Sequence, residues 1–173
     1  MKAFIITGTS SGIGKELTEQ LLQDNDNLVI GISRSNTLEH PNFKHISLDL
    51  NDVVDIEGIE FPKWKNATQI SLIHNAGWIG PMQKMGNQEM GAIAASYLIN
   101  LVAPAILSNH FIASFNESKA QKVILSISSG AAHSPVEGWN TYCSAKAGLD
   151  MLSKCIDEEH EDIINLSIAP GKV

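Results

Sequence analysis

The sequence predicts an α/β protein built on a doubly wound parallel sheet. Short runs rich in Val, Ile and Leu alternate with stretches of helical spacing along all 173 residues. The runs are apolar on both faces, as expected for parallel strands that helices cover from both sides. A glycine-rich turn between Gly8 and Gly14 joins the first run to the first helical stretch. Such folds bind ligands at the carboxyl ends of their strands, so loops there are where chemistry is expected.

The elements follow one another without a linker or an internal repeat. Strands are expected at residues 2–7, 28–33, 43–48, 69–74, 122–127 and 163–168. Helices are expected at residues 12–24, 51–59, 88–114 and 140–160, and Pro104 is the expected point of strain in the long third helix. The prediction is therefore one domain over residues 1–173. Because the sequence stops soon after the sixth strand, we expect the C-terminal part of this domain to be missing.

Composition argues against several functional classes. Apolar residues make up 43% of the chain and charged residues 18%, which is typical of a folded globular protein. A net charge of −7 argues against a nucleic-acid partner, and no apolar run in the sequence reaches the roughly 18 residues of a membrane span. Cys143 and Cys155 lie twelve residues apart on one predicted helix, too far to bridge. Unbridged thiols and no apparent export signal lead us to expect a cytoplasmic protein. We expect no metal, because the six histidines show no ligand spacing.

The glycine-rich turn predicts a phosphate site. Glycines at 8, 12 and 14 permit a tight turn and a close approach of the backbone to a pyrophosphate. The N-terminus of the following helix adds N–H groups and a positive dipole end. A plain strand–helix turn is the alternative. The residues predicted to bind the pyrophosphate are Gly8, Ser10, Ser11, Gly12, Ile13 and Gly14.

Tyr142 and Lys146 form a candidate proton-transfer pair. Residues four apart on a helix lie on one face, about 5–6 Å apart at Cβ. A lysine charge that close favours the phenolate, so the tyrosine could exchange a proton with a carbonyl or alcohol oxygen. Ser129 stands thirteen residues before the tyrosine. A half-buried tyrosine bonded to a backbone carbonyl is the alternative interpretation of Tyr142 alone.

Taken together, these motifs resemble those of the short-chain dehydrogenase/reductase family over nearly the whole chain. The resemblance rests on the GxxxGxG spacing of Thr7–Gly14, on Asn75-Ala76-Gly77, on Asn100, on the Ser129–Tyr142–Lys146 set and on Pro170-Gly171. It implies a Rossmann fold and a nicotinamide cofactor. Thr9 and the stretches Asn100–Leu107 and Trp139–Met151 are most similar to the sepiapterin reductases and the bacterial benzil reductases.

The resemblance also implies a role for each residue. Tyr142 is the proton donor to the substrate oxygen, and Lys146 assists it and binds the nicotinamide ribose. Ser129 donates to the same oxygen, with Ser126 and Ser128 as competitors for this role. Asn100 holds a water that connects Lys146 to solvent. The family's NAG motif corresponds to Asn75, Ala76 and Gly77, and Pro170 and Gly171 form the turn beside the nicotinamide.

The end of the second strand predicts NADP(H) as the cofactor. Arg34 stands where an acidic residue would reject a 2′-phosphate, and a guanidinium suits that phosphate. An arginine lying over the adenine or on the surface is the alternative. Many NADP-using relatives carry a second basic residue where this chain has Ser11, so the preference is expected to be softer here. Asp49 and Leu50 resemble the pair that contacts adenine, although Asp49 could instead cap the next helix.

The resulting functional hypothesis is an NADPH-dependent reductase of a small carbonyl compound such as an α-diketone, a pterin or a ketone. A 3-ketoacyl thioester reductase and a non-catalytic NADP-binding sensor or scaffold remain as alternatives. Trp78, Met82, Met85 and Trp139 either line a substrate cleft or simply pack. His74 replaces the first asparagine of NNAG, and a bond from its ring to the backbone is the plain interpretation.

The expected partner besides the substrate is a second copy of the chain. The helices around 88–114 and 140–160 are apolar over more than one face, which favours pairing about a two-fold axis. The family resemblance implies the same interface. The sequence leaves a homodimer and a homotetramer open.

Overall fold

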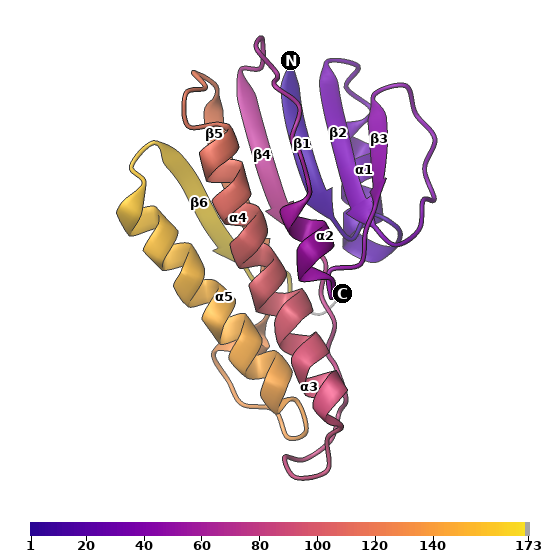
Figure 1. The fold of residues 1–173 in the computed structure, drawn as a ribbon, viewed down its shortest axis with the longest axis vertical. Coiled ribbons are helices and arrows are strands. Elements are labelled where there is room, and N and C mark those ends of the chain that lie inside the picture. Colours follow the sequence, from indigo (N-terminus) through magenta and orange to yellow (C-terminus); the bar gives the residue numbers. More distant parts are fainter. Residues whose placement is uncertain (172–173) are drawn as a thin grey trace.

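A computed structural model describes residues 1–171, which form a six-stranded parallel sheet with helices on both faces (Figure 1). The strand order is β3-β2-β1-β4-β5-β6, so the chain starts in the middle of the sheet and winds first to one edge and then to the other. This order confirms the doubly wound parallel sheet. The domain prediction runs to Val173, and residues 172–173 lie outside the described part.

The strands lie within one residue of the positions that the apolar runs predict. They are β1 (Lys2–Thr7), β2 (Asn27–Ser33), β3 (Phe43–Ser47), β4 (Gln69–His74), β5 (Gln121–Ile127) and β6 (Ile163–Ile168). Each is rich in β-branched residues, which suit a pleated, buried surface. In the parallel register, Ile5 of β1 lies opposite Ile30 of β2 and Leu72 of β4. The six carboxyl ends therefore meet at one edge, the lower one in Figure 1.

The helices are shorter than predicted in two places. They are α1 (Gly12–Leu21), α2 (Val53–Glu57), α3 (Met90–Tyr97), the π-helix η1 (Leu98–Val102), α4 (Ala103–Ser114), the 3₁₀ turn η2 (Gly130–Ala132) and α5 (Asn140–Glu159). The prediction of residues 12–24 overran the end of α1 at Leu21. The prediction of residues 51–59 was too long for α2, because Asp52 accepts from the N–H groups of Val54 and Asp55 and so caps a helix that begins after it.

The long predicted helix changes its winding where η1 joins α3 to α4. Within η1, the N–H of Ala103 donates to the carbonyl of Leu98, a π-helical bond. Pro104 has no N–H to offer the carbonyl of Asn100, one α-helical turn earlier. The prediction placed the strain at Pro104 itself. The structure puts it one turn earlier, and Pro104 lies in the first turn of α4, where proline is tolerated.

The helices cover the two faces of the sheet unequally. Leu107 and Phe111 of α4 pack with Ile5, Leu72 and other buried residues on the face that is in front in Figure 1. Leu17, Leu21 and Leu22 from α1 and its end pack with Phe4 and Ile6 on the back. Right-handed crossovers explain the division, since the winding from β1 to β2 and the winding from β4 to β6 run toward opposite edges.

The back of the β5–β6 edge carries no helix among the described residues. Ile164, Leu166 and Ile168 alternate along β6 and are each 43–50% exposed, whereas Ile163 and Asn165 face the helices and are buried. Among the described residues, the back of this edge is therefore an exposed apolar surface. The front of the same strands is packed against α4 and α5, and α5 carries the candidate pair Tyr142 and Lys146.

Candidate active site

The glycine-rich turn leaves the carboxyl end of β1 and packs against the segment that follows β4. Gly8 has a positive φ of 76°, and a Cβ there would lie 2.9 Å from the Cα of Ala76. Asn75 donates through Nδ2 to the carbonyls of Thr7 and Gly8, at 2.9 and 3.1 Å. Thr7 Oγ1 in turn accepts from the N–H groups of Asn75 and Ala76. The predicted NAG motif thus braces the turn, and a side chain at Gly8 would separate the two segments.

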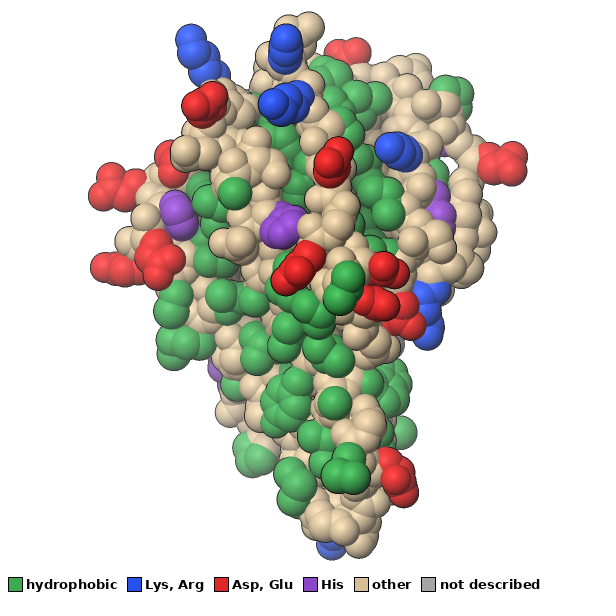
Figure 2. All heavy atoms as spheres, viewed as in Figure 1, with side chains coloured by type: hydrophobic (Ala, Val, Ile, Leu, Met, Phe, Trp, Pro, Cys, Tyr) green, Lys and Arg blue, Asp and Glu red, His purple; other side chains and the backbone are tan. Residues whose placement is uncertain are grey.

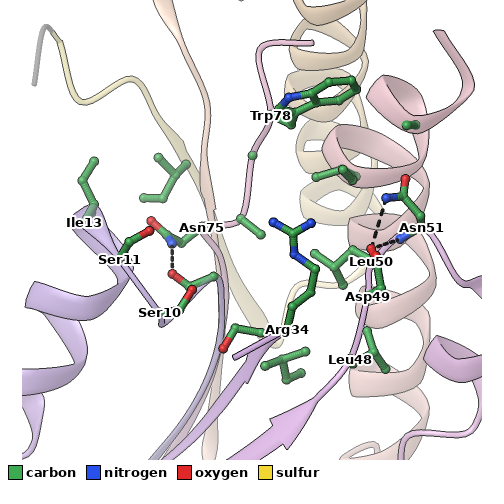
Figure 3. Close-up of a pocket in the computed structure, with 18 residues that line it drawn as sticks. Ser10, Ser11, Ile13, Arg34, Leu48, Asp49, Leu50, Asn51, Asn75 and Trp78 are labelled. Atoms are coloured by element: carbon green, nitrogen blue, oxygen red, sulfur yellow. Dashed lines mark hydrogen bonds between the residues drawn. The ribbon is translucent and has the colours of Figure 1, made fainter. Parts of the chain in front are cut away.

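A cavity of about 650 Å³ opens at these carboxyl ends (Figure 3). It holds most of the residues predicted to bind the cofactor. Among the predicted residues, those that line it are Gly8, Ser10, Ser11, Ile13, Arg34, Asp49, Leu50, Asn75, Ala76 and Gly77. Gly12 and Gly14 do not line it. Gly12 supplies a positive φ of 54° at the start of α1, and Gly14 is buried against Gly8 and Asn75, where a Cβ would overlap both.

Arg34 follows β2 and extends its guanidinium into the cavity, toward Leu50 (Figure 3). It is exposed and makes no ion pair among the described residues. The neighbouring Ser33 is buried, and its hydroxyl donates to the carbonyl of Ser35 at 2.9 Å. No carboxylate occupies positions 33 to 35. The end of β2 therefore presents a free cation and hydroxyls to the cavity, a surface suited to a phosphate.

Asp49 also faces the cavity, and the alternative that it caps a helix is wrong. Its Oδ1 accepts from the backbone N–H and the side-chain amide of Asn51, at 3.0 and 3.1 Å. The cap of α2 is Asp52. Leu50 is buried beside Asp49 and offers an apolar wall. This side of the cavity suits a flat heterocycle, with one apolar face and one polar rim.

A second cavity, of about 240 Å³, adjoins the first and holds the candidate proton-transfer pair. The two cavities share Ile13, Asn75, Gly77 and Ile127. Those four residues lie between the two cavities. The other residues that line the second cavity are Ile79, Ser128, Ser129, Tyr142, Lys146, Pro170 and Gly171. A ligand that spans both cavities would bring one end to Tyr142.

Within this cavity, Lys146 lies against the ring of Tyr142 on α5. Its Nζ is 5.7 Å from the centroid of the ring and donates to the carbonyl of Ile127 at 2.8 Å. The side chain of Lys146 is 3% exposed. Burial, partly opposed by the charge of Asp150, lowers the pKa of Lys146 to about 8. A lysine of that pKa is a cation at neutral pH but close enough to neutrality to exchange its proton.

His74 lies at the end of β4 and stays neutral. Its Nε2 is 2.8 Å from Ser108 Oγ, so the expected bond to the backbone is wrong. Burial, reinforced by the charge of Lys146, lowers the pKa of His74 to about 3. The neutral ring therefore adds no second positive charge beside Lys146.

Two serines reach the catalytic cavity. Ser129 Oγ accepts from the N–H of Ala131 at 3.2 Å, which leaves its own hydrogen free to donate. Ser128 Oγ is buried without a hydrogen-bond partner. Ser126 lies within β5 and does not line the cavity, so it drops out as a competitor. The geometry leaves Ser129 and Ser128 as the two possible hydroxyl donors.

Asn100 is buried in η1, and its amide bonds to backbone groups of the protein. Nδ2 donates to the carbonyls of Trp78 and Ser96 at 2.7 and 2.8 Å, and Oδ1 accepts from the N–H of Trp78 at 3.0 Å. The side chain thus fixes the loop after β4. The backbone carbonyl of Asn100 cannot receive the usual α-helical bond, because Pro104 has no N–H to donate.

Some functional groups could not be found from the sequence motifs. The carbonyl of Ile127 that holds Lys146 is a backbone atom, which no residue pattern reveals. Ile79 and Trp78 enter the cavities because Asn100 binds the backbone of Trp78. Thr7 was visible as part of the glycine motif, but its clamp on Asn75 and Ala76 depends on the pairing of β1 with β4.

Comparison with known proteins gives this arrangement a family. A family model described as short chain dehydrogenase matches residues 2–173. The chain is 36% identical over 190 residues to a benzil reductase ((S)-benzoin forming) of Bacillus cereus, covering 100% of this chain and 76% of that protein. It is 26% identical over 189 residues to the sepiapterin reductase of Mus musculus, covering 96% of this chain and 72% of that protein.

A solved structure shares the fold of this chain. The crystal structure of a short-chain dehydrogenase/reductase from Burkholderia vietnamiensis superimposes with a TM-score of 0.86 at 30% identity, covering 98% of this chain and 84% of that one. The six-stranded parallel sheet agrees with these matches. The chain belongs to the short-chain dehydrogenase/reductase family, whose members are oxidoreductases that bind nicotinamide cofactors.

Proposed function

We propose that the protein is an NADPH-dependent reductase of small apolar carbonyl compounds, with aromatic α-diketones as the substrate class. One observation carries the proposal. The cavity that contains Arg34 adjoins the cavity that contains Tyr142, Lys146 and Ser129, and the two share four lining residues. A dinucleotide site and a proton donor therefore lie next to each other, as reduction of a carbonyl requires.

The residues present fit a phosphorylated dinucleotide. The turn from Gly8 to Gly14 lacks side chains where the backbone must approach a ligand, and nothing lies within 4 Å of where a Cβ of Gly12 would be. Ser10 and Ser11 stand at the N-terminus of α1, a favourable place for an anion. Arg34 would bind the 2′-phosphate, and Leu50 and Asp49 would flank the adenine. When bound, the cofactor supplies the hydride.

Three side chains would complete the reduction. Tyr142 donates its phenolic proton to the substrate oxygen. Lys146 stabilises the resulting phenolate through its positive charge, 5.7 Å from the ring centroid. Ser129 donates its free hydrogen to the same oxygen and stabilises the charge that develops there.

Asn100 would support the return of the proton. Its side-chain amide is bonded to the backbone of Trp78 and Ser96. We assign the role to its backbone carbonyl instead, which the π-helical turn leaves without an α-helical donor. A water held there could pass protons from solvent to Lys146.

The apolar surroundings of Tyr142 support a flat, apolar substrate. Trp139 packs edge-on to Tyr142, with ring centroids 5.9 Å apart, and Ile79 lines the catalytic cavity. Trp78 and Met82 follow on the same loop and are exposed. The 36% identical relative from Bacillus cereus is named a benzil reductase, and benzil is an apolar aromatic α-diketone.

We further propose that two copies pair through α3, α4 and α5. Hydrophobic side chains gather over these helices on the face shown in Figure 2. The helical stretch Met90–Ser114 has a mean hydropathy of 1.8 in its most apolar window, and only 28% of that window is buried. By length and composition this stretch could span a membrane, so the expectation that no apolar run is long enough is wrong. It packs against α5 in a sheet-covering layer, and a second copy would cover its exposed side. A gel-filtration mass equal to one chain would contradict the pairing.

The two cysteines are free thiols, in keeping with a proposed cytoplasmic location.

The test of the proposed function is cofactor oxidation by the purified protein. NADPH is mixed with benzil, sepiapterin and acetoacetyl thioester in separate assays. The proposal predicts fastest oxidation with benzil and slower oxidation with NADH than with NADPH. Exclusive turnover of the thioester would favour a 3-ketoacyl reductase. Tight NADPH binding without turnover of any of the three would favour a non-catalytic sensor or scaffold.

A further inference from the structure

Asp150 lies one helical turn after Lys146 on α5, in a fixed position. Its side chain is 12% exposed. Ser167 of β6 donates to Oδ1 at 2.6 Å, and Nε2 of His133, just after η2, lies 3.3 Å from Oδ2. The carboxylate is therefore held from two neighbouring elements and cannot swing freely into solvent.

Lys146 has no carboxylate in direct contact among the described residues. Its Nζ bonds to a neutral acceptor, the carbonyl of Ile127. The titratable groups that face it are His74 from β4, and Tyr142 and Asp150 from α5 itself. His74 is neutral and Tyr142 is its reaction partner. Asp150 is the one negative charge among these three groups.

The tie between α5 and β6 does not by itself require a charge at position 150, and the other partner of the carboxylate, His133, is an exposed imidazole that is charged only when it is protonated. The same helix and strand are tied a second time, by Asn165, whose Nδ2 donates to the carbonyl of Ser153 at 2.5 Å. That tie uses neutral groups. An asparagine at position 150 could bond to Ser167 as well, without the cost of removing a carboxylate from water. Since residues i and i+4 share one helix face, the charge of Asp150 is placed to act on Lys146.

We propose that Asp150 is a positioning residue whose carboxylate, fixed by Ser167 and His133, holds Lys146 as a cation beside Tyr142. The inference rests on the proposed function, because it assigns Asp150 to the same proton transfer. Burial pulls the pKa of Lys146 down, and Asp150 opposes that shift. Without Asp150, Lys146 would lose its proton at a lower pH, and Tyr142 would lose its stabilising charge under working conditions.

The first experiment follows Lys146 itself and needs no turnover. Protein labelled with ¹³C and ¹⁵N at lysine is titrated by NMR, and the Lys146 signal is assigned by its loss in Lys146→Arg. We expect Asp150→Asn to lower the titration midpoint of Lys146 by about one pH unit. Ser167→Ala removes the tie but keeps the charge, and it should leave the midpoint within about 0.3 units. Asp150→Glu should restore it.

The second experiment measures the pH dependence of kcat with NADPH and benzil. In Asp150→Asn we expect kcat within about twofold of the wild type near pH 6.5 and about five- to tenfold lower near pH 8.5. A uniform loss at all pH values, or a Lys146 midpoint that does not move, would overturn the proposal. Asp150→Ser gives the same comparison if Asp150→Asn folds poorly. A shifted midpoint with no turnover in the wild type would support the coupling and count against the proposed reduction.

Discussion

Two buried lysines, Lys122 and Lys146, lie at opposite ends of the strands and differ in what surrounds them. Lys122 is 5% exposed at the start of β5, and its Nζ pairs with Asp162 at 2.5 Å. The hydrogen bond from Lys122 holds the pKa of Asp162 below its usual range. Lys146 is 3% exposed, bonds to the carbonyl of Ile127, and has its pKa lowered to about 8 by burial.

The surroundings indicate that Lys122 is a structural cation and that Lys146 is the cation of the candidate active site. At the amino edge of the strands, a direct carboxylate partner fixes the charge of Lys122 and ties β5 to the start of β6. At the carboxyl edge, Lys146 keeps its charge with no direct partner and lies against Tyr142. A buried cation without a direct partner costs stability, so its presence indicates a function that offsets the cost.

Loss of the phenol of Tyr142, at the carboxyl ends of the strands, should have the largest effect on activity. In Tyr142→Phe we expect kcat with NADPH and benzil to fall about 10³-fold, because the proton donor is gone, while NADPH affinity stays within about twofold. Tyr97→Phe is the matched control. Its hydroxyl bonds to Ser144 outside the catalytic cavity, so that variant should keep near-normal kcat. Equal losses in both variants would contradict the assignment.

The stability cost of Lys146 should appear as a pH dependence. Its folded pKa of about 8 lies below the ordinary value of 10.5, so the unfolded chain binds the proton more tightly between these values. The free energy of unfolding should therefore gain about 3 kcal/mol from this residue as pH rises from 8 to 10.5. Urea unfolding of wild type and Lys146→Met across that range measures it. A rise of equal size in Lys146→Met would mean that other groups cause it.

Substitutions at the sites of the two lysines should have different effects on kcat. We expect Lys146→Met to lower kcat by about a hundredfold, since the phenolate loses its stabilising charge. Asp162→Asn leaves the buried ammonium of Lys122 without its carboxylate partner, so it should lower the urea midpoint of unfolding and leave kcat unchanged. If Asp162→Asn instead lowers kcat with the fold intact, the two edges are not independent.

Arg34, a third cation, is exposed and should affect cofactor choice alone. In Arg34→Ser the Kd for NADPH should rise about tenfold or more, because a charge-assisted bond to phosphate is lost. The Kd for NADH should change little. Fluorescence titration with both cofactors measures the ratio, and an equal loss for the two would place the guanidinium over the adenine instead.

The sequence was sufficient for the sheet and for the residues that meet at its carboxyl edge. Apolar runs such as Gln69–His74 predict strands directly, because burial on both faces requires them. Tyr142 and Lys146 were recognisable because helical spacing is local. The place of the helix break was less accessible, since it depends on which carbonyl Pro104 leaves unsatisfied.

Contacts between distant segments could not be derived from the chain. The amide of Asn100 binds the backbone of Trp78, 22 residues earlier, a contact that no local pattern shows. The partner of His74 is Ser108 on α4, which only packing brings near. The holders of Asp150 come from β6 and from the loop after η2. In each case the sequence gives the residue type, and tertiary packing decides what it touches.

Isotope transfer tests the central claim most directly. The protein is given benzil and NADPH that carries deuterium at the transferable position of the nicotinamide, and the product is examined by mass spectrometry and NMR. The account predicts benzoin with one deuterium on the carbinol carbon from the wild type, and almost no product from Tyr142→Phe with the cofactor bound. Benzoin without deuterium, or equal product from Tyr142→Phe, would contradict it.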